Sequence, residues 1–166
     1  MKSIELLTQP IYKDHRGSFT PINIKGEWIQ SNISINDDVY TLRGLHYQNS
    51  PFEQTKLVSV VRGKIIDFAI NLDKTSEDYK KVHIFHLDEG GSVLIPKGYA
   101  HGFITLQSGT IVNYLVDNVY SKENEGCVLW SSVPEIYELV SSILNGMTFK
   151  IKISEKDTVG DNFNDL

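Results

Sequence analysis

The sequence predicts an all-β fold, a sandwich or a barrel, with one short helix near its C-terminal end. Short runs rich in β-branched and aromatic residues alternate with turn residues along most of the chain, which is typical of these architectures. Three pairs of runs are each separated by a turn that contains glycine. These pairs are residues 56–61 with 64–72, 82–87 with 92–95, and 103–106 with 110–116. We expect each pair to form a β-hairpin.

One segment, residues 134–145, has the periodicity of a helix. Its apolar side chains recur every three or four residues, at Ile136, Leu139, Val140, Ile143 and Leu144. Pro134 suits a first helical turn, and Gly146 is placed to end the helix. The polar, acidic residues 157–166 that follow are expected to fray unless another part of the chain holds them.

Length and composition indicate one domain. A chain of 166 residues that is 40% hydrophobic can bury a single core, so we expect one domain over residues 1–166. The net charge of -5 gives no overall basic field, and nucleic-acid binding is not expected. The single cysteine, Cys127, cannot form an internal disulfide, which fits a reducing compartment. No secretory signal and no apolar run near the ~20 residues of a membrane span are evident, so we expect a cytoplasmic protein without a membrane partner.

Residues 29–35 alternate between polar and apolar side chains, which indicates a strand with two unlike faces. Gln30, Asn32 and Ser34 share one face, whereas Ile29, Ile33 and Ile35 share the other. The polar face either meets solvent or lines a barrel lumen that holds a polar ligand. The pattern alone leaves both alternatives open.

A guanidinium and an imidazole stand three residues apart in the strand-like run 42–48. His46 is the natural proton carrier near neutral pH. On an ideal pleat Arg43 and His46 would point in opposite directions, whereas His46 and Gln48 would share a face. A β-bulge at Gly44 would bring Arg43 and His46 to the same side.

Further along the chain, Lys56, His101 and Tyr114 complete a set of base, cation, second imidazole and phenol. Such a set suits proton transfer at carbon. Each residue also has an ordinary structural interpretation: Lys56 as a surface lysine, His101 as a hydrogen-bonded core histidine, and Tyr114 as a half-buried strand tyrosine.

The run Gly90, five residues, Pro96-x-Gly98-x-x-His101 resembles the second motif of the cupin superfamily. Its Pro and Gly residues form a tight corner that returns His101 to the barrel. The resemblance implies a cupin-like double-stranded β-helix, that is, a jelly-roll barrel, with the short C-terminal helix added to it.

The first cupin motif usually reads His-x-His, three or four residues, then Glu, and this chain has His46-x-Gln48 followed by Glu53. Gln48 replaces a strong imidazole ligand by a weak neutral oxygen donor. We therefore expect no metal and no other cofactor. The alternative, a metal-dependent cupin dioxygenase or isomerase, would use His46, Gln48, Glu53 and His101.

Several blocks in register resemble the dTDP-4-dehydrorhamnose 3,5-epimerase family over roughly residues 11–130. They are Asp14-x-Arg16-Gly17-x-Phe19, Gln30-x-Asn32-x-Ser34, Leu42 to Gln48, Gln54-x-Lys56-Leu57-Val58, Pro96 to Phe103, Tyr114 with Tyr120, and Glu125-Gly126. Ser154-Glu155-Lys156-Asp157 is similar to a segment near the end of these proteins.

The resemblance implies a nucleotide-diphosphate sugar as substrate, a 4-keto-6-deoxy sugar whose C4 carbonyl acidifies the hydrogens at C3 and C5. Inversion then needs a base on one face, a cation at the enolate oxygen and an acid on the other face. By resemblance His46 is the base, Asp157 orients it, Lys56 stabilises the enolate and Tyr114 is the acid.

The resemblance also implies the residues that bind substrate. Arg16, Arg43 and Lys156 are the candidates for the diphosphate, because cationic side chains bind phosphate in a charge-assisted manner. Tyr120 is expected against the nucleotide base, and His101 at the sugar or diphosphate. Sugar hydroxyls or the base are expected to meet Gln30, Asn32, Gln48 and Glu125. We expect a homodimer, in which Arg16 reaches across the subunit interface.

Two departures from the family pattern stand out. Pro21 replaces an acidic residue, and Trp130-Ser131-Ser132 replaces Trp-Asn-Asp. These changes are compatible with another nucleotide, a different 4-keto sugar, or epimerisation at one carbon. A non-catalytic sugar-binding cupin is the second alternative function.

Overall fold

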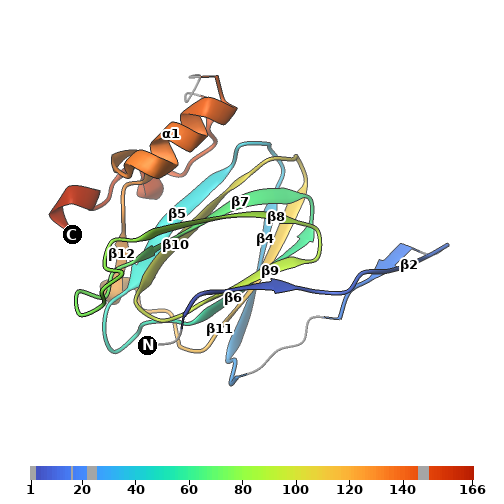
Figure 1. Cartoon of the computed structure of the whole chain (residues 1–166), viewed down its shortest axis with the longest axis horizontal. Coiled ribbons are helices and arrows are strands. Elements are labelled where there is room, and N and C mark those ends of the chain that lie inside the picture. The colour runs from blue at the N-terminus through green and yellow to red at the C-terminus, as the bar shows by residue number, and fades with distance from the viewer. Residues whose placement is uncertain (1–2, 16, 22–25, 146–149) are drawn as a thin grey trace.

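The computed structural model describes residues 3–15, 17–21, 26–145 and 150–166. Two five-stranded antiparallel sheets face each other and form a jelly-roll barrel (Figure 1). The first sheet has the order β1 (Glu5–Thr8), β9 (Gly91–Ile95), β6 (Lys56–Arg62), β11 (Thr110–Val116) and β4 (Gln30–Asn36). The second has the order β12 (Glu125–Cys127), β5 (Leu42–Gln48), β10 (Tyr99–Thr105), β7 (Lys64–Asn71) and β8 (Val82–Asp88). The cupin-like all-β fold is confirmed.

A small hairpin of β2 (Tyr12–Asp14) and β3 (Gly17–Phe19) stands apart from the two sheets (Figure 1). None of the helices in the described ranges is both long and apolar enough to cross a membrane.

The three predicted hairpins are wrong, although the strands themselves are confirmed. β6 and β7 follow each other closely, but β7 pairs with β8 and β10 in the other sheet. The pairs β8–β9 and β10–β11 are likewise divided between the sheets. Each glycine-containing turn is therefore a corner where the chain crosses to the opposite sheet. At the first corner Gly63 has a φ of 90°, and a side chain there would collide with Thr110.

The predicted helix is present as α1 (Pro134–Ile143). Pro134 occupies its first turn, and Ile136 and Val140 are buried. These side chains join a cluster with Leu42 and Phe68 on the outer face of the second sheet. Short 3-10 turns flank the helix in sequence: η1 (Lys122–Asn124), η2 (Trp130–Ser132), η4 (Glu155–Thr158) and η5 (Phe163–Asp165). The predicted helix stop at Gly146 lies outside the described residues.

Strand β7 is buried on both faces, which explains its nearly continuous apolar run. Ile66, Phe68 and Ile70 belong to the cluster under α1. Ile65 and Ala69 belong to a second cluster, which fills the barrel between the sheets.

Strand β4 settles the question of its polar face. Ile33 and Ile35 are 69% and 61% exposed on the outside of the barrel. In register Asn32 and Ser34 lie opposite Tyr114 and Val112 of β11, and both Val112 and Asn36 are buried. The polar face turns inward, which is the arrangement of a lumen that holds a polar ligand.

The bulge predicted at Gly44 is confirmed. His46 on β5 lies opposite His101 on β10, and Arg43 lies opposite Phe103. Three steps along β5 thus match two steps along β10, so β5 carries one extra residue between Arg43 and His46. Gly44 has a φ of 101°, and a Cβ on it would lie 2.6 Å from the carbonyl oxygen of His101.

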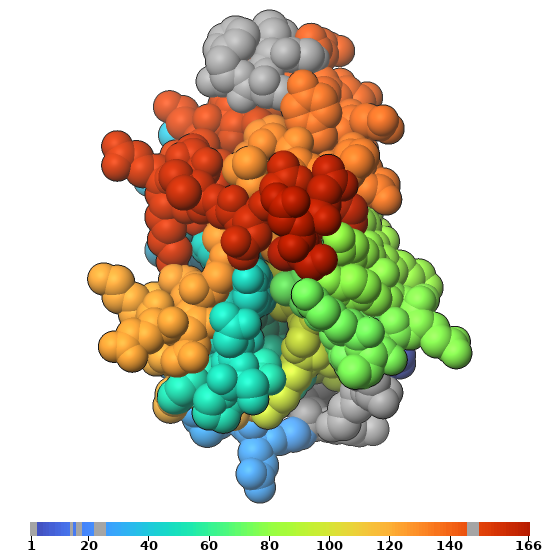
Figure 2. All heavy atoms as spheres, turned by 90° about the vertical axis from the view of Figure 1, so that its left-hand side faces the viewer, coloured from blue at the N-terminus to red at the C-terminus, as the bar shows by residue number. Residues whose placement is uncertain are grey.

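The C-terminal segment is held against β12. The amide of Leu129 donates to the carbonyl of Asp161 at 2.9 Å, and the amide of Asp161 donates to that of Cys127 at 2.8 Å. In Figure 2 this segment, in red, lies between the orange residues around α1 and the turquoise residues that follow β5. Residues 157–166 were expected to fray unless another part of the chain holds them. These hydrogen bonds hold the segment to the residues around β12.

Candidate active site

A cavity of about 510 Å³ opens between the two sheets and collects the expected catalytic residues. His46 on β5 and His101 on β10 form its wall on the second sheet. Lys56 on β6 and Tyr114 on β11 form the wall on the first sheet, and Asp157 enters from η4. Five elements therefore contribute titratable groups to one space.

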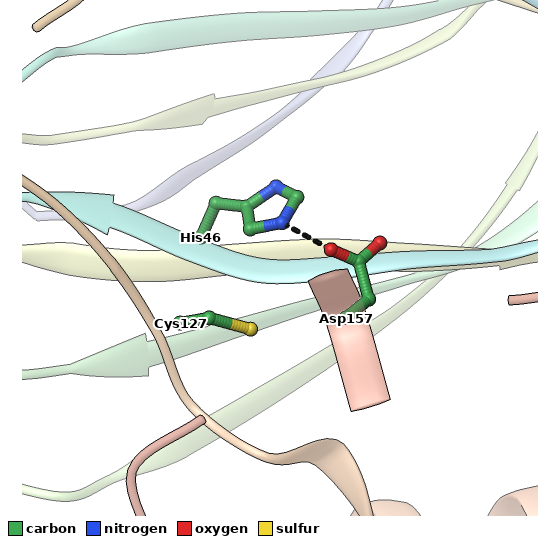
Figure 3. Close-up of side chains that lie close together, drawn as sticks. All are labelled: His46, Cys127 and Asp157. Carbon is green, nitrogen blue, oxygen red and sulfur yellow. Dashed lines mark hydrogen bonds and ion pairs between the residues drawn. The ribbon is translucent and has the colours of Figure 1, made fainter. Parts of the chain in front are cut away.

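His46 is hydrogen-bonded to a buried carboxylate. Its Nε2 lies 2.7 Å from Oδ1 of Asp157 (Figure 3). The other carboxylate oxygen accepts the amide of Gly44 at 3.2 Å, which links the bulge to the aspartate. Burial alone would raise the pKa of Asp157, but the hydrogen bond and charge of His46 outweigh it and lower the pKa below its ordinary value. An ionised Asp157 accepts the proton on Nε2 and leaves Nδ1 of His46 with a free lone pair.

The ammonium group of Lys56 has a lowered pKa. Burial lowers its pKa to about 8, although the carboxylates of Asp67 and Glu125 act in the opposite direction. Its Nζ lies 3.4 Å from the carbonyl oxygen of His46, and no carboxylate among the described residues is within ion-pair distance of it. Near neutral pH this ammonium is available to a developing negative charge in the cavity.

Tyr114 faces the cavity from the sheet opposite to His46. In register it lies between Val58 of β6 and Asn32 of β4. Burial raises its pKa above the ordinary value, and the nearby positive charge of Arg43 offsets this in part. Tyr114 therefore remains a phenol at neutral pH, which suits a proton donor.

His101 is paired with a second buried carboxylate, Asp67 of β7. Its Nε2 lies 2.8 Å from Oδ2 of Asp67, which is completely buried. The other oxygen, Oδ1, has no hydrogen-bond partner among the described residues. We did not predict Asp67 as a site residue, yet it is a lone acidic residue in the apolar run of β7, which is the signal that could have found it.

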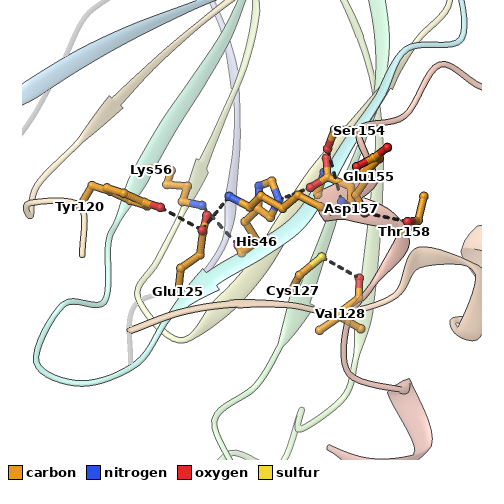
Figure 4. A network of polar contacts seen from close by, with 12 residues as sticks. His46, Lys56, Tyr120, Glu125, Cys127, Val128, Ser154, Glu155, Asp157 and Thr158 are labelled. Carbon is orange, nitrogen blue, oxygen red and sulfur yellow. Dashed lines mark hydrogen bonds and ion pairs between the residues drawn. The ribbon is translucent and has the colours of Figure 1, made fainter. Parts of the chain in front are cut away.

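The expected substrate-binding residues Arg43, Tyr120, Glu125 and Lys156 lie near one another. Arg43 and Lys156 line the cavity. Lys156 Nζ donates to Oε2 of Glu125 at 2.6 Å. The Tyr120 hydroxyl donates to the same oxygen at 3.0 Å (Figure 4). Burial would raise the pKa of Glu125, but these two hydrogen bonds lower it below its ordinary value. The three side chains form a polar chain that leads from the exposed Tyr120 to the cavity.

Gln48 does not join this site. Its Nε2 donates to the carbonyls of Phe52 and Val119 at 2.6 and 3.1 Å, and its Oε1 accepts the amide of Ser121 at 2.6 Å. Both ends of the amide are therefore used to tie backbone segments together. The structure therefore does not bring Gln48 together with the other expected substrate-binding residues.

The ligand set of a metal-dependent cupin is not assembled either. His46 and His101 line the cavity between the sheets, whereas Gln48 and Glu53 line a separate one of about 570 Å³. This second cavity is the hollow in Figure 2 between the turquoise residues after β5 and the green loop between β7 and β8. The geometry thus disfavours the metal-dependent alternative.

Gln30 and Asn32 lie on β4 outside the described wall of the cavity, with Gln30 Nε2 donating to Asn32 Oδ1 at 2.6 Å. Arg16 lies outside the described residues. Of the departures from the family pattern, Ser132 has a structural role, because its hydroxyl donates to Leu129 and accepts the amide of Phe163 at 2.7 and 2.9 Å.

Comparison with known proteins identifies a family for this chain. The family model of dTDP-4-dehydrorhamnose 3,5-epimerase matches residues 2–165. A dTDP-4-dehydrorhamnose 3,5-epimerase of Sinorhizobium fredii is 32% identical over 139 residues, which cover 76% of this chain and 71% of that protein.

Two crystal structures are similar over nearly the whole chain. The dTDP-4-dehydrorhamnose 3,5-epimerase of Bacillus anthracis, with TDP and PPi bound, has a TM-score of 0.82 and 33% identity, covering 95% of this chain and 93% of that one. The dTDP-6-deoxy-D-glucose-3,5-epimerase of Legionella pneumophila, in complex with dTDP-4-keto-L-rhamnose, has a TM-score of 0.81 and 26% identity, covering 97% and 88%.

The fold and the relatives define a carbohydrate epimerase, an isomerase with a cupin-like barrel. The chain belongs to the dTDP-4-dehydrorhamnose 3,5-epimerase family.

Proposed function

We propose that this protein inverts C3, C5 or both carbons of a dTDP-linked 4-keto-6-deoxy sugar through an enolate. The observation that carries the proposal is the placement of His46 and Tyr114, which reach one cavity from opposite sheets. The ligand dTDP-4-keto-L-rhamnose in the Legionella relative supports the class of substrate.

His46 acts as the base. The lone pair on its Nδ1 takes the hydrogen of C3 or C5 as a proton, and the electrons of that C–H bond move into the C4 carbonyl to form an enolate. Asp157 holds the ring and stabilises the imidazolium that results.

Lys56 stabilises the enolate. The negative charge develops on the oxygen at C4, and an ammonium without a carboxylate partner in the described residues is suited to meet it. An interaction of this kind lowers the barrier because it strengthens as the charge develops.

Tyr114 returns the proton. Its phenol protonates the carbon from the face opposite His46, so the configuration inverts. The phenolate then takes a proton from solvent and the imidazolium loses one, which restores both groups for the next turnover.

Arg43 and Lys156 supply the positive charge for the diphosphate, and Tyr120 offers an exposed ring for the nucleotide base. His101 and Glu125 are the proposed contacts to the sugar or the base. We include no metal or organic cofactor in this scheme.

A homodimer is part of the proposal. Ile33 and Ile35 on the outer face of β4, and Ile29 directly before it, are 69%, 61% and 58% exposed. Among the described strands β4 pairs with β11 alone, so it is an edge strand with an apolar outer face. A second copy of the chain would cover it. A single domain and a cytoplasmic location complete the proposal.

The function is tested by incubating the protein with dTDP-4-keto-6-deoxyglucose in deuterated water and following the sugar by NMR. Deuterium at C3, at C5 or at both confirms the reaction and assigns its regiochemistry. Activity should persist in a chelator. Binding of the nucleotide sugar with no isotope exchange would overturn the enzymatic proposal in favour of a sugar-binding module.

A further inference from the structure

Cys127 lies beside His46 and Asp157 but has no part in the reaction above. It is on β12, directly opposite His46 of β5 in the register of the sheet. Asp157 reaches the same place from η4, so three elements converge there (Figure 3). A ring nitrogen of His46, the Sγ of Cys127 and a carboxylate oxygen of Asp157 all lie within 4.8 Å of one another.

We propose that these three side chains form a binding site for a thiophilic divalent cation such as Zn²⁺ or Cd²⁺, and that the bound cation inhibits the enzyme.

The donor set selects this class of cation. Imidazole nitrogen, thiolate sulfur and carboxylate oxygen are the ligands of protein zinc sites, and three of them leave a fourth position for water. The thiolate favours soft cations, whereas Mg²⁺ and Ca²⁺ prefer sites made of oxygen alone. The metal-dependent cupin set considered above shares His46 with this site, but not Cys127 or Asp157.

The spacing requires small movements. In a tetrahedral zinc site, metal–ligand bonds of about 2.0–2.3 Å place the donor atoms roughly 3.3–3.5 Å apart. His46 Nε2 and Asp157 Oδ1, now at 2.7 Å, must separate by about 0.6–0.8 Å to admit a cation. The Sγ of Cys127 donates a weak hydrogen bond to the carbonyl of Val128 at 3.7 Å, which a rotation toward the pair would break.

Binding moves protons but involves no redox step. The thiol proton of Cys127 passes to solvent. The proton between His46 and Asp157 moves to the other ring nitrogen, because the cation takes its place at Nε2. That other nitrogen, Nδ1, then has no lone pair to accept a proton from the sugar. The inhibitory part of this inference rests on the proposed function, whereas the binding part does not.

The binding part is tested by titrating the purified protein with Cd²⁺ and recording the ultraviolet charge-transfer band of cadmium bound to thiolate. Cys127 is the single cysteine of the chain, so the band reports on this position alone. We expect one Cd²⁺ per chain, loss of the band in Cys127→Ser, and at least tenfold weaker binding in both His46→Asn and Asp157→Asn. The exposed His86 provides a matched control, and His86→Gln should bind Cd²⁺ as the wild type does.

Absence of the band in the wild-type protein would overturn the proposal. So would a band whose affinity is unchanged in His46→Asn and Asp157→Asn, since Cys127 would then bind the cation without them. Circular dichroism of each variant separates a lost ligand from a lost fold.

The inhibitory part is tested by adding Zn²⁺ to the isotope-exchange assay. We expect reversible inhibition in the wild type that a chelator relieves, no effect of Mg²⁺, and at least tenfold lower sensitivity to Zn²⁺ in Cys127→Ser. The metal-free rate of this variant should match that of the wild type. Equal sensitivity of the variant and the wild type would contradict the proposal even if the epimerase activity is confirmed.

Discussion

His46 and His101 lie opposite each other on neighbouring strands, and each is hydrogen-bonded through Nε2 to a different aspartate, at 2.7 and 2.8 Å. The two pairs differ in their access to solvent. The side chain of His46 is 28% exposed, whereas that of His101 is 8% exposed and its partner Asp67 is completely buried. The more open pair with Asp157 is therefore the one placed to exchange protons with solvent between turnovers.

Replacing Asp157 by Asn should reduce kcat by roughly 10²- to 10⁴-fold, the range of a general acid–base contribution. The amide can still meet the ring, but it does not stabilise the imidazolium. Because Asp157 acts through His46, KM should change little. Steady-state kinetics check this, and a rise in KM at constant kcat would show that Asp157 serves substrate binding instead.

Because of Lys56, kcat/KM of the enzyme should fall on the alkaline side of its pH profile. The pKa of its ammonium is about 8, so the charged form that stabilises the enolate is lost as pH rises through that value. Lys56→Gln should lower kcat/KM by roughly 10²- to 10³-fold, as for loss of one oxyanion-stabilising group. The variant should also lack this fall near pH 8. A fall that persists unchanged in Lys56→Gln would assign it to another group.

Gly44→Ala should destabilise the fold by about 2–4 kcal/mol. The added Cβ would meet the carbonyl of His101 at 2.6 Å, and the φ of 101° is already unfavourable for alanine. Gly109→Ala is the matched control, since Gly109 also has a positive φ, of 67°, but its Cβ would meet nothing within 4 Å. Thermal or urea unfolding should show that the control loses about 1 kcal/mol of the free energy of unfolding. Equal losses in both variants would mean that the bulge tolerates a side chain.

Asp157 should contribute to stability above its unfolded-state pKa. Because its pKa is lower in the folded protein, the unfolded state takes up the proton first as pH falls. The stabilisation is present at neutral pH and disappears as pH drops through the folded-state pKa. Asp157→Asn should therefore have a lower free energy of unfolding than the wild type at pH 7. The difference in free energy of unfolding between the two proteins should become smaller in acid. A difference that is constant across this pH range would contradict the linkage.

Local sequence rules predicted several features correctly. Pro134 and the spacing of Ile136 and Val140 were enough for the helix, because capping and periodicity act within a few residues. The bulge at Gly44 was also predictable from nearby residues. Without a bulge, Arg43 and His46 would point in opposite directions on an ideal pleat.

Other features depend on contacts between distant segments, which local rules do not contain. A glycine turn looks alike whether the next strand folds back beside the first or crosses to the other sheet, so the hairpins were predicted wrongly. The hydrogen bonds of Gln48 to Val119 and Ser121 join segments more than 70 residues apart, so local rules do not reveal them. The Asp67–His101 pair likewise depends on the register between β7 and β10.

The placement of base and acid on opposite walls is tested most directly with Tyr114→Phe and the 4-keto sugar nucleotide in deuterated water. We predict that His46 still removes the proton in this variant and returns a deuteron to the same face. NMR should then show deuterium entering C3 or C5 with the starting configuration retained, while inversion falls by roughly 10²- to 10⁴-fold. Inversion at the wild-type rate in this variant would contradict the account.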